Sequence, residues 1–135
     1  MSSVFSAAEL GYLGERRLGR LATVDAAGLP HVVPLGWAYN PATDTVDVTG
    51  RNFARTAKFR NALANPLVAL VIDDVLPPWQ PRAVMVRGRA EVRGEAAGEG
   101  GAPTERILRI HPIQVLSWGL ASADEVPTTP SGDLG

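Results

Sequence analysis

Short segments in which apolar and polar residues alternate with a period of two constrain the fold of this chain more than any other feature. The clearest of them runs from Ala83 to Val92. In a strand, successive side chains point to opposite faces, so this pattern predicts one buried and one solvated face. Similar segments recur along the chain with turn residues between them, which is typical of an antiparallel sheet.

The first two strands are expected at 20–24 and 31–39, on either side of the turn Asp25-Ala26-Ala27-Gly28, where the glycine can adopt a positive φ. The second strand has one bulky face (His31, Val33, Leu35, Trp37 and Tyr39) and one small face (Val32, Pro34, Gly36 and Ala38). Further strands are expected at 43–50, at 67–72 with both faces covered, and at 104–110 and 113–118, separated by His111-Pro112.

Two helices interrupt the strands. Ser6 and Glu9 form a capping-box pattern that predicts a short helix from Ser6 to Leu13. Asn52 is a suitable N-cap for a longer helix over 53–64, which Asn65-Pro66 ends. Prolines break regular structure over 75–81, and the Gly-rich segment 94–103 predicts a surface loop.

About seven strands with two short helices predict a mostly β, antiparallel barrel. The helices do not alternate with the strands, which excludes a parallel dinucleotide-binding fold. With 135 residues the chain fits one domain, expected over residues 1–120. Residues 121–135 are rich in Ser, Thr, Pro, Gly and acidic side chains, so a disordered tail is expected there.

Composition excludes several classes of function. The chain has no cysteine and two histidines, so thiol catalysis is excluded and a metal site is not expected. A net charge of −1 lacks the basic surface of a nucleic-acid-binding protein. Neither a signal peptide nor a membrane-spanning segment is visible, so we expect a cytoplasmic protein that does not bind membranes.

The segment from Thr49 to Lys58 carries the strongest chemical pattern. Arg51, Arg55 and Lys58 stand at i, i+4 and i+7, so they project from one side of a helix start. Free backbone N–H groups and the helix dipole attract an anion there, and a phosphate would fit. The alternative is a solvated basic face on a surface helix.

The order of several motifs resembles a known family. These motifs are Leu21-Ala22-Thr23-Val24, Gly28-Leu29-Pro30-His31, Thr49-Gly50-Arg51 through Lys58, and Asn65-Pro66. The chain resembles the pyridoxamine 5'-phosphate oxidase-like split β-barrel superfamily. The segment from Arg106 through His111-Pro112 to Val115-Leu116-Ser117-Trp118-Gly119-Leu120 is similar to its F420-dependent reductase branch. The chain departs from the family where the loop 94–103 stands in place of a helix that many members have near the substrate.

The resemblance implies a homodimer with a cofactor groove at each end of the interface, holding the deazaflavin F420 or, alternatively, FMN. By position it implies that Val33, Pro34, Leu35 and Gly36 line the tricyclic ring. It places Thr49, Gly50, Arg51, Arg55, Thr56 and Lys58 at the phosphate. The bare face of Pro34 and Gly36 leaves room for a flat ring, although a bulge in the barrel explains the same residues.

The implied activity is that of an oxidoreductase in which reduced F420 delivers a hydride to a conjugated double bond or carbonyl of a small organic molecule. Because the cofactor carries the chemistry, few acid or base residues are needed, and no catalytic residue is assigned. The alternatives are an FMN-dependent oxidase or reductase and a non-catalytic flavin or F420 carrier. Trp79 follows Pro77-Pro78 in a loop and is expected over the cofactor or at the dimer seam. His31 is either a proton donor or a solvated residue at a strand edge.

Overall fold

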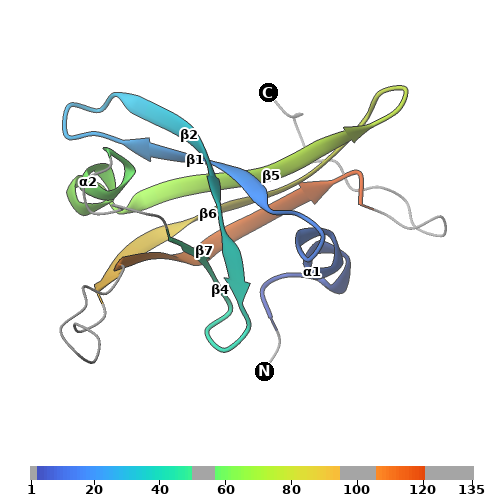
Figure 1. Cartoon of the computed structure of the whole chain (residues 1–135), viewed down its shortest axis with the longest axis horizontal. Coiled ribbons are helices and arrows are strands. Elements are labelled where there is room, and N and C mark those ends of the chain that lie inside the picture. The colour runs from blue at the N-terminus through green and yellow to red at the C-terminus, as the bar shows by residue number, and fades with distance from the viewer. Residues whose placement is uncertain (1–2, 50–56, 95–105, 121–135) are drawn as a thin grey trace, which may run out of the picture.

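The computed structural model describes residues 3–49, 57–94 and 106–120, and these form a curled antiparallel sheet with a helix near each of two opposite ends (Figure 1). The sheet has seven strands in the order β2-β1-β5-β6-β7-β4-β3. Their bounds are β1 Leu18–Val24, β2 Pro30–Gly36, β3 Ala38–Asn40, β4 Thr45–Val48, β5 Leu67–Leu76, β6 Gln80–Gly94 and β7 Arg106–Trp118. The antiparallel split barrel expected from the sequence is confirmed.

The β1–β2 hairpin forms as its turn residues predict. Gly28 has a φ of +88°, which a residue with a side chain rarely adopts. The Asp25 carboxylate accepts hydrogen bonds from the backbone N–H groups of Ala27 and Leu29. The segment expected as one strand over 31–39 is divided, because β2 ends at Gly36 and β3 begins at Ala38.

The core lies inside the curl, between the inward faces of the strands. Nine aliphatic side chains there are fully buried: Leu21, Val46, Val48, Leu70, Ile72, Val84, Val86, Leu108 and Ile110. Helix α1, Ala7–Leu13, contributes Tyr12 and Leu13 to this core, and the Ser6–Glu9 capping box that starts it is present as predicted. Helix α2, Ala57–Ala64, adds Ala62, and Asn61 Nδ2 donates to Thr23 Oγ1 over 3.0 Å.

The β5–β6 hairpin differs from the expectation. The break in regular structure is confined to the turn at 77–79, because Leu76 pairs with Gln80 and Val75 pairs with Pro81. A proline is tolerated there because, among the described strands, none lies beside that part of the hairpin. The expectation that both faces of β5 are covered is also wrong for this chain, since burial alternates along the strand and Leu67 is 52% exposed.

Strand β7 is continuous where two strands were expected. Pro112 lacks an N–H group, which suggested a break after Ile110, but β4 pairs with β7 only from Leu108 to Ile110. On its other side, Pro112 stands opposite Gly88, where the β6–β7 register shifts. The position that lacks an N–H group therefore lies beyond the residues of β7 that pair with β4, and next to the register shift between β6 and β7.

Several sequence expectations lie outside the described residues. These are the helix start over 52–56, nearly all of the loop 94–103 and the tail 121–135. Within the described residues, no helix is long and apolar enough to cross a bilayer.

Candidate functional site

A cavity of about 660 Å³ opens over the middle strands of the sheet, close to α2. A volume of this size lies within the range of small-molecule and cofactor pockets. Its walls are mostly apolar, so they suit a flat organic ring. The lining residues are Ala22, Thr23, Val24, Pro30, Leu67, Val68, Ala69, Arg87, Gly88, Ile113 and Gln114.

A β-bulge shapes one side of this cavity. Arg87 pairs with Gln114 and Gly88 pairs with Pro112, so Ile113 has no partner on β6 and its side chain is 68% exposed. A Cβ at Gly88 would lie 2.4 Å from the His111 carbonyl oxygen, so only glycine fits there. The bulge thus turns an apolar side chain toward the cavity.

Polar donors stand on the same side. Arg87 Nη1 donates to Gln114 Oε1 over 2.8 Å, and both side chains are exposed. The sequence analysis did not single out either residue as functional. The alternation along 83–92 placed Arg87 on the solvated face, but only the bulge and the pairing with β7 bring it beside Gln114.

Strand β2, expected to line the ring, presents a small outward face. The side chains of Val33 and Leu35 point into the core, whereas Pro34 and Gly36 are exposed. None of these four residues lines the 660 Å³ cavity, although Pro30 of the same strand does. Within the described sheet β2 pairs only with β1, so backbone N–H and C=O groups along its other edge are available to a ligand.

The expected phosphate-binding residues are described only in part. Thr49 is exposed directly after β4, and Lys58 lies in the first turn of α2. Gly50, Arg51, Arg55 and Thr56 lie outside the described residues.

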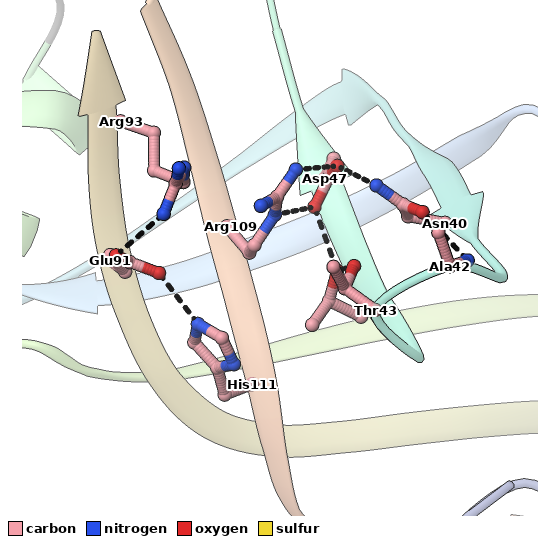
Figure 2. A network of polar contacts seen from close by, with 9 residues as sticks. Asn40, Ala42, Thr43, Asp47, Glu91, Arg93, Arg109 and His111 are labelled. Atoms are coloured by element: carbon pink, nitrogen blue, oxygen red, sulfur yellow. Dashed lines mark hydrogen bonds and ion pairs between the residues drawn. The ribbon is translucent and has the colours of Figure 1, made fainter.

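A partly buried ion pair fixes the end of β4 that leads to Thr49. Figure 2 shows Asp47 of β4 facing Arg109 of β7, with Nε and Nη2 of the guanidinium each 3.1 Å from a carboxylate oxygen. Burial alone would raise the pKa of Asp47, but hydrogen bonds from Arg109, Asn40 and Thr45 outweigh it and hold the pKa below its usual value. The contact ties β4 to β7 two residues before Thr49.

A second polar contact lies on the neighbouring strands. His111 Nε2 is 2.8 Å from Glu91 Oε1, and Arg93 pairs with the other carboxylate oxygen of Glu91 (Figure 2). His111 and Arg93 lower the pKa of Glu91. Asp47 and Glu91 are therefore stabilised as anions, which makes them weak bases. The geometry of the described residues suits binding better than acid–base catalysis.

Trp79 stands apart from these features. It occupies the turn between β5 and β6, its side chain is 74% exposed, and it does not line the cavity. The sequence analysis expected Trp79 over the cofactor or at the dimer seam, and within one chain it lies at the tip of the β5–β6 hairpin, outside the 660 Å³ cavity.

The family model described as pyridoxamine 5'-phosphate oxidase matches residues 7–119. A relative from Streptomyces rimosus, named a 5a,11a-dehydrotetracycline/5a,11a-dehydrooxytetracycline reductase, is 38% identical in a 120-residue alignment that covers 86% of this chain and 84% of the relative.

Solved structures share the fold. An FAD-binding protein from Mesorhizobium loti is 26% identical with a TM-score of 0.63, over 84% of this chain and 91% of that one. A protein named F420 reductase is 22% identical with a TM-score of 0.62, over 84% of this chain and 98% of that one.

Proposed function

Because the chain belongs to the pyridoxamine 5'-phosphate oxidase-like family, we propose that it is a homodimeric reductase that takes its reducing equivalents from F420. The family and the reductase relative support an oxidoreductase with a flavin-type cofactor. The preference for F420 over FMN rests on the resemblance of residues 106–120 to the F420-dependent branch.

The described residues fit a flavin-type ring. Pro34 and Gly36 leave the outer face of β2 bare, and the free strand edge offers backbone groups to polar ring atoms. On this proposal the ring lies along Val33, Pro34, Leu35 and Gly36, with the inward side chains of Val33 and Leu35 holding the backbone in place. Thr49, Gly50, Arg51, Arg55, Thr56 and Lys58 take the phosphate.

The cofactor supplies a hydride for a conjugated double bond or carbonyl of the substrate. The protein then needs to bind and orient the cofactor and the substrate and to exclude water from them. This agrees with the stabilised anions at Asp47 and Glu91, which are weak bases. The name of the Streptomyces relative points to a flat, polycyclic substrate with a reducible double bond. The apolar cavity, with Arg87 and Gln114 at one side, suits an oxygen-rich molecule of that kind.

Exposed apolar side chains support the homodimer. Leu29, Val32, Leu67 and Ile113 are each more than half exposed, which is a large apolar surface for one small domain. We expect sedimentation to give a dimer at micromolar concentration. A monomer under those conditions would contradict both the dimer and a groove between subunits.

The cofactor is tested by titrating F420 and FMN side by side at low and moderate salt. F420 should bind more tightly, and its binding should weaken with salt because its acidic tail meets exposed cations. Lys58→Ala should weaken binding by ~1–3 kcal/mol, the scale of a lost charge-assisted hydrogen bond. Arg93→Ala removes a charge of the same sign from an exposed ion pair and serves as the control.

Each alternative has its own outcome. Micromolar FMN binding without F420 binding would show that the cofactor is FMN and not F420. F420 binding without reduction of any conjugated enone would indicate a carrier. If a folded Lys58→Ala/Arg55→Ala protein bound the cofactor with unchanged affinity, the start of the helix would be a solvated basic face and not a phosphate site.

A further inference from the structure

A second cavity, of about 450 Å³, lies beside α1, at the end of the sheet away from α2 (Figure 1). One side is formed by α1 and the residues that follow it, and the other by residues 37–41, where β2 passes into β3. The lining residues are Leu10, Leu13, Gly14, Arg16, Trp37, Ala38, Tyr39 and Pro41. None of them lines the 660 Å³ cavity, so the two cavities are separate.

Two buried N–H groups at this cavity have no hydrogen-bond acceptor. Three buried side-chain nitrogens lack a partner within the described part of the chain, and two of them, Arg16 Nε and Trp37 Nε1, belong to residues that line the cavity. The third is His31 Nδ1, on β2. Buried donors are paired in most proteins, because an unpaired donor loses its hydrogen bonds to water and gains none in return. Since bulk water does not reach either nitrogen, the missing acceptor has to come from a molecule seated against these side chains.

Both donors are held in place. The Arg16 guanidinium stacks over the Tyr12 ring at 4.4 Å, and its Nη2 lies 3.2 Å from an Asp74 carboxylate oxygen. Trp37 packs directly on the backbone of β1, because a Cβ at Gly19 would lie 3.1 Å from Trp37 Cδ1. Donors that are already fixed lose little conformational freedom when a ligand binds, which favours binding.

The charges beside the cavity favour an uncharged ligand. Arg16 pairs with Asp74, which also accepts from Arg82 Nη2 at 2.6 Å, and the Glu15 carboxylate lies 3.8 Å from Arg16 Nη1. Two guanidinium groups therefore face two carboxylates, and their charges balance. An anion in the cavity would meet Asp74 without finding an unpaired cation.

The remaining walls are apolar or aromatic. Leu10, Leu13 and Pro41 supply aliphatic surface, and the Tyr39 hydroxyl is already used, since it donates to Asp44 over 2.6 Å. Such walls suit a carbon ring, and a few placed donors fix its orientation. A carbonyl oxygen matches these donors, because it has two lone pairs and no proton and can therefore only accept.

We propose that this cavity binds an uncharged cyclic ketone or a related carbonyl compound, with carbonyl oxygen accepting hydrogen bonds from Arg16 Nε and Trp37 Nε1. The inference goes beyond the proposed function. It involves none of the residues assigned to the cofactor, and it holds whether the protein uses F420 or FMN.

The indole N–H signals of the full chain test the site directly. A ¹⁵N-labelled sample gives three indole signals, one for each tryptophan, and Trp37→Phe identifies the signal of Trp37. The probe is 1-tetralone, and its control is tetralin, which has the same carbon skeleton without the carbonyl group. 1-Tetralone should move the Trp37 signal downfield, as a new hydrogen bond does, and tetralin should not. The signal of Trp79, which is 74% exposed and lies outside the cavity, should stay in place with both compounds.

Affinities separate recognition of the carbonyl group from apolar binding. Trp37→Phe keeps an aromatic ring but removes the N–H group, so it should bind 1-tetralone about tenfold more weakly, the scale of one lost hydrogen bond. Trp79→Phe is the matched control and should bind with the affinity of wild type. 1-Naphthoate has two fused rings as well but carries a negative charge, and it should bind at least tenfold more weakly than 1-tetralone.

Three results would overturn the proposal: a Trp37 signal that 1-tetralone leaves in place, an equal shift with tetralin, or equal affinities of Trp37→Phe and Trp79→Phe. Tighter binding of 1-naphthoate than of 1-tetralone would refute the uncharged ligand. These measurements require no F420 or FMN, so their failure is distinguishable from a failure of the cofactor titration.

Discussion

Replacing Asp74 by asparagine tests how much the contacts of its carboxylate with Arg82, Tyr12 and Arg16 contribute to stability. The Arg82 guanidinium, ahead of the Tyr12 hydroxyl and the charge of Arg16, lowers the pKa of Asp74 from 3.8 to about 2. At 1.36 kcal/mol per pKa unit this difference corresponds to roughly 2.4 kcal/mol. The carboxylate is 31% exposed, so solvent screening reduces the contribution to about 1 kcal/mol.

The pH dependence has a definite sign. Because the folded-state pKa is depressed, the stabilisation is complete above the unfolded-state pKa near 3.8 and is lost as pH falls from about 4 through 2. Urea denaturation at pH 7 should show Asp74→Asn less stable by ~1–2 kcal/mol. The difference from wild type should shrink toward pH 2.

Asp73 is the matched control, because it is the next residue and pairs with Arg20 in an exposed ion pair. Asp73→Asn should cost about 0.5 kcal/mol or less. Equal losses in the two variants, or a loss in Asp74→Asn that persists at pH 2, would refute the reasoning.

Three further substitutions probe the packing, two of them at the wall of the 660 Å³ cavity and one in α1 as a control. Gly88→Ala puts a Cβ 2.4 Å from the His111 carbonyl oxygen and should destabilise the fold by ~1–3 kcal/mol. Gly11→Ala, in the open middle of α1, should instead stabilise the fold by ~0.5–1 kcal/mol. Thermal unfolding of the two variants checks this contrast. Thr23→Val leaves the buried Asn61 amide without its acceptor and should cost ~1–3 kcal/mol in denaturant unfolding, and an unchanged midpoint would show that this hydrogen bond does not hold α2 on the sheet.

Some features depend on residues only a few positions apart, and the sequence alone was enough to predict these. The Ser6–Glu9 capping box predicted α1, and Gly28 predicted the β1–β2 turn. The alternation over 83–92 predicted the buried face of β6 and placed Arg87 on the other face. Period-two patterns and turn residues act locally, so they can be recognised without knowing which strands pair.

Other features depend on which strands lie side by side, and only the tertiary structure decided them. Pro112 suggested the end of a strand, but β7 runs through it because β4 no longer pairs there and β6 shifts register. The prolines after Val75 suggested irregular structure, but β5 and β6 pair up to the turn and form one long hairpin. Strand pairing joins residues far apart in the chain, so a local pattern does not contain it.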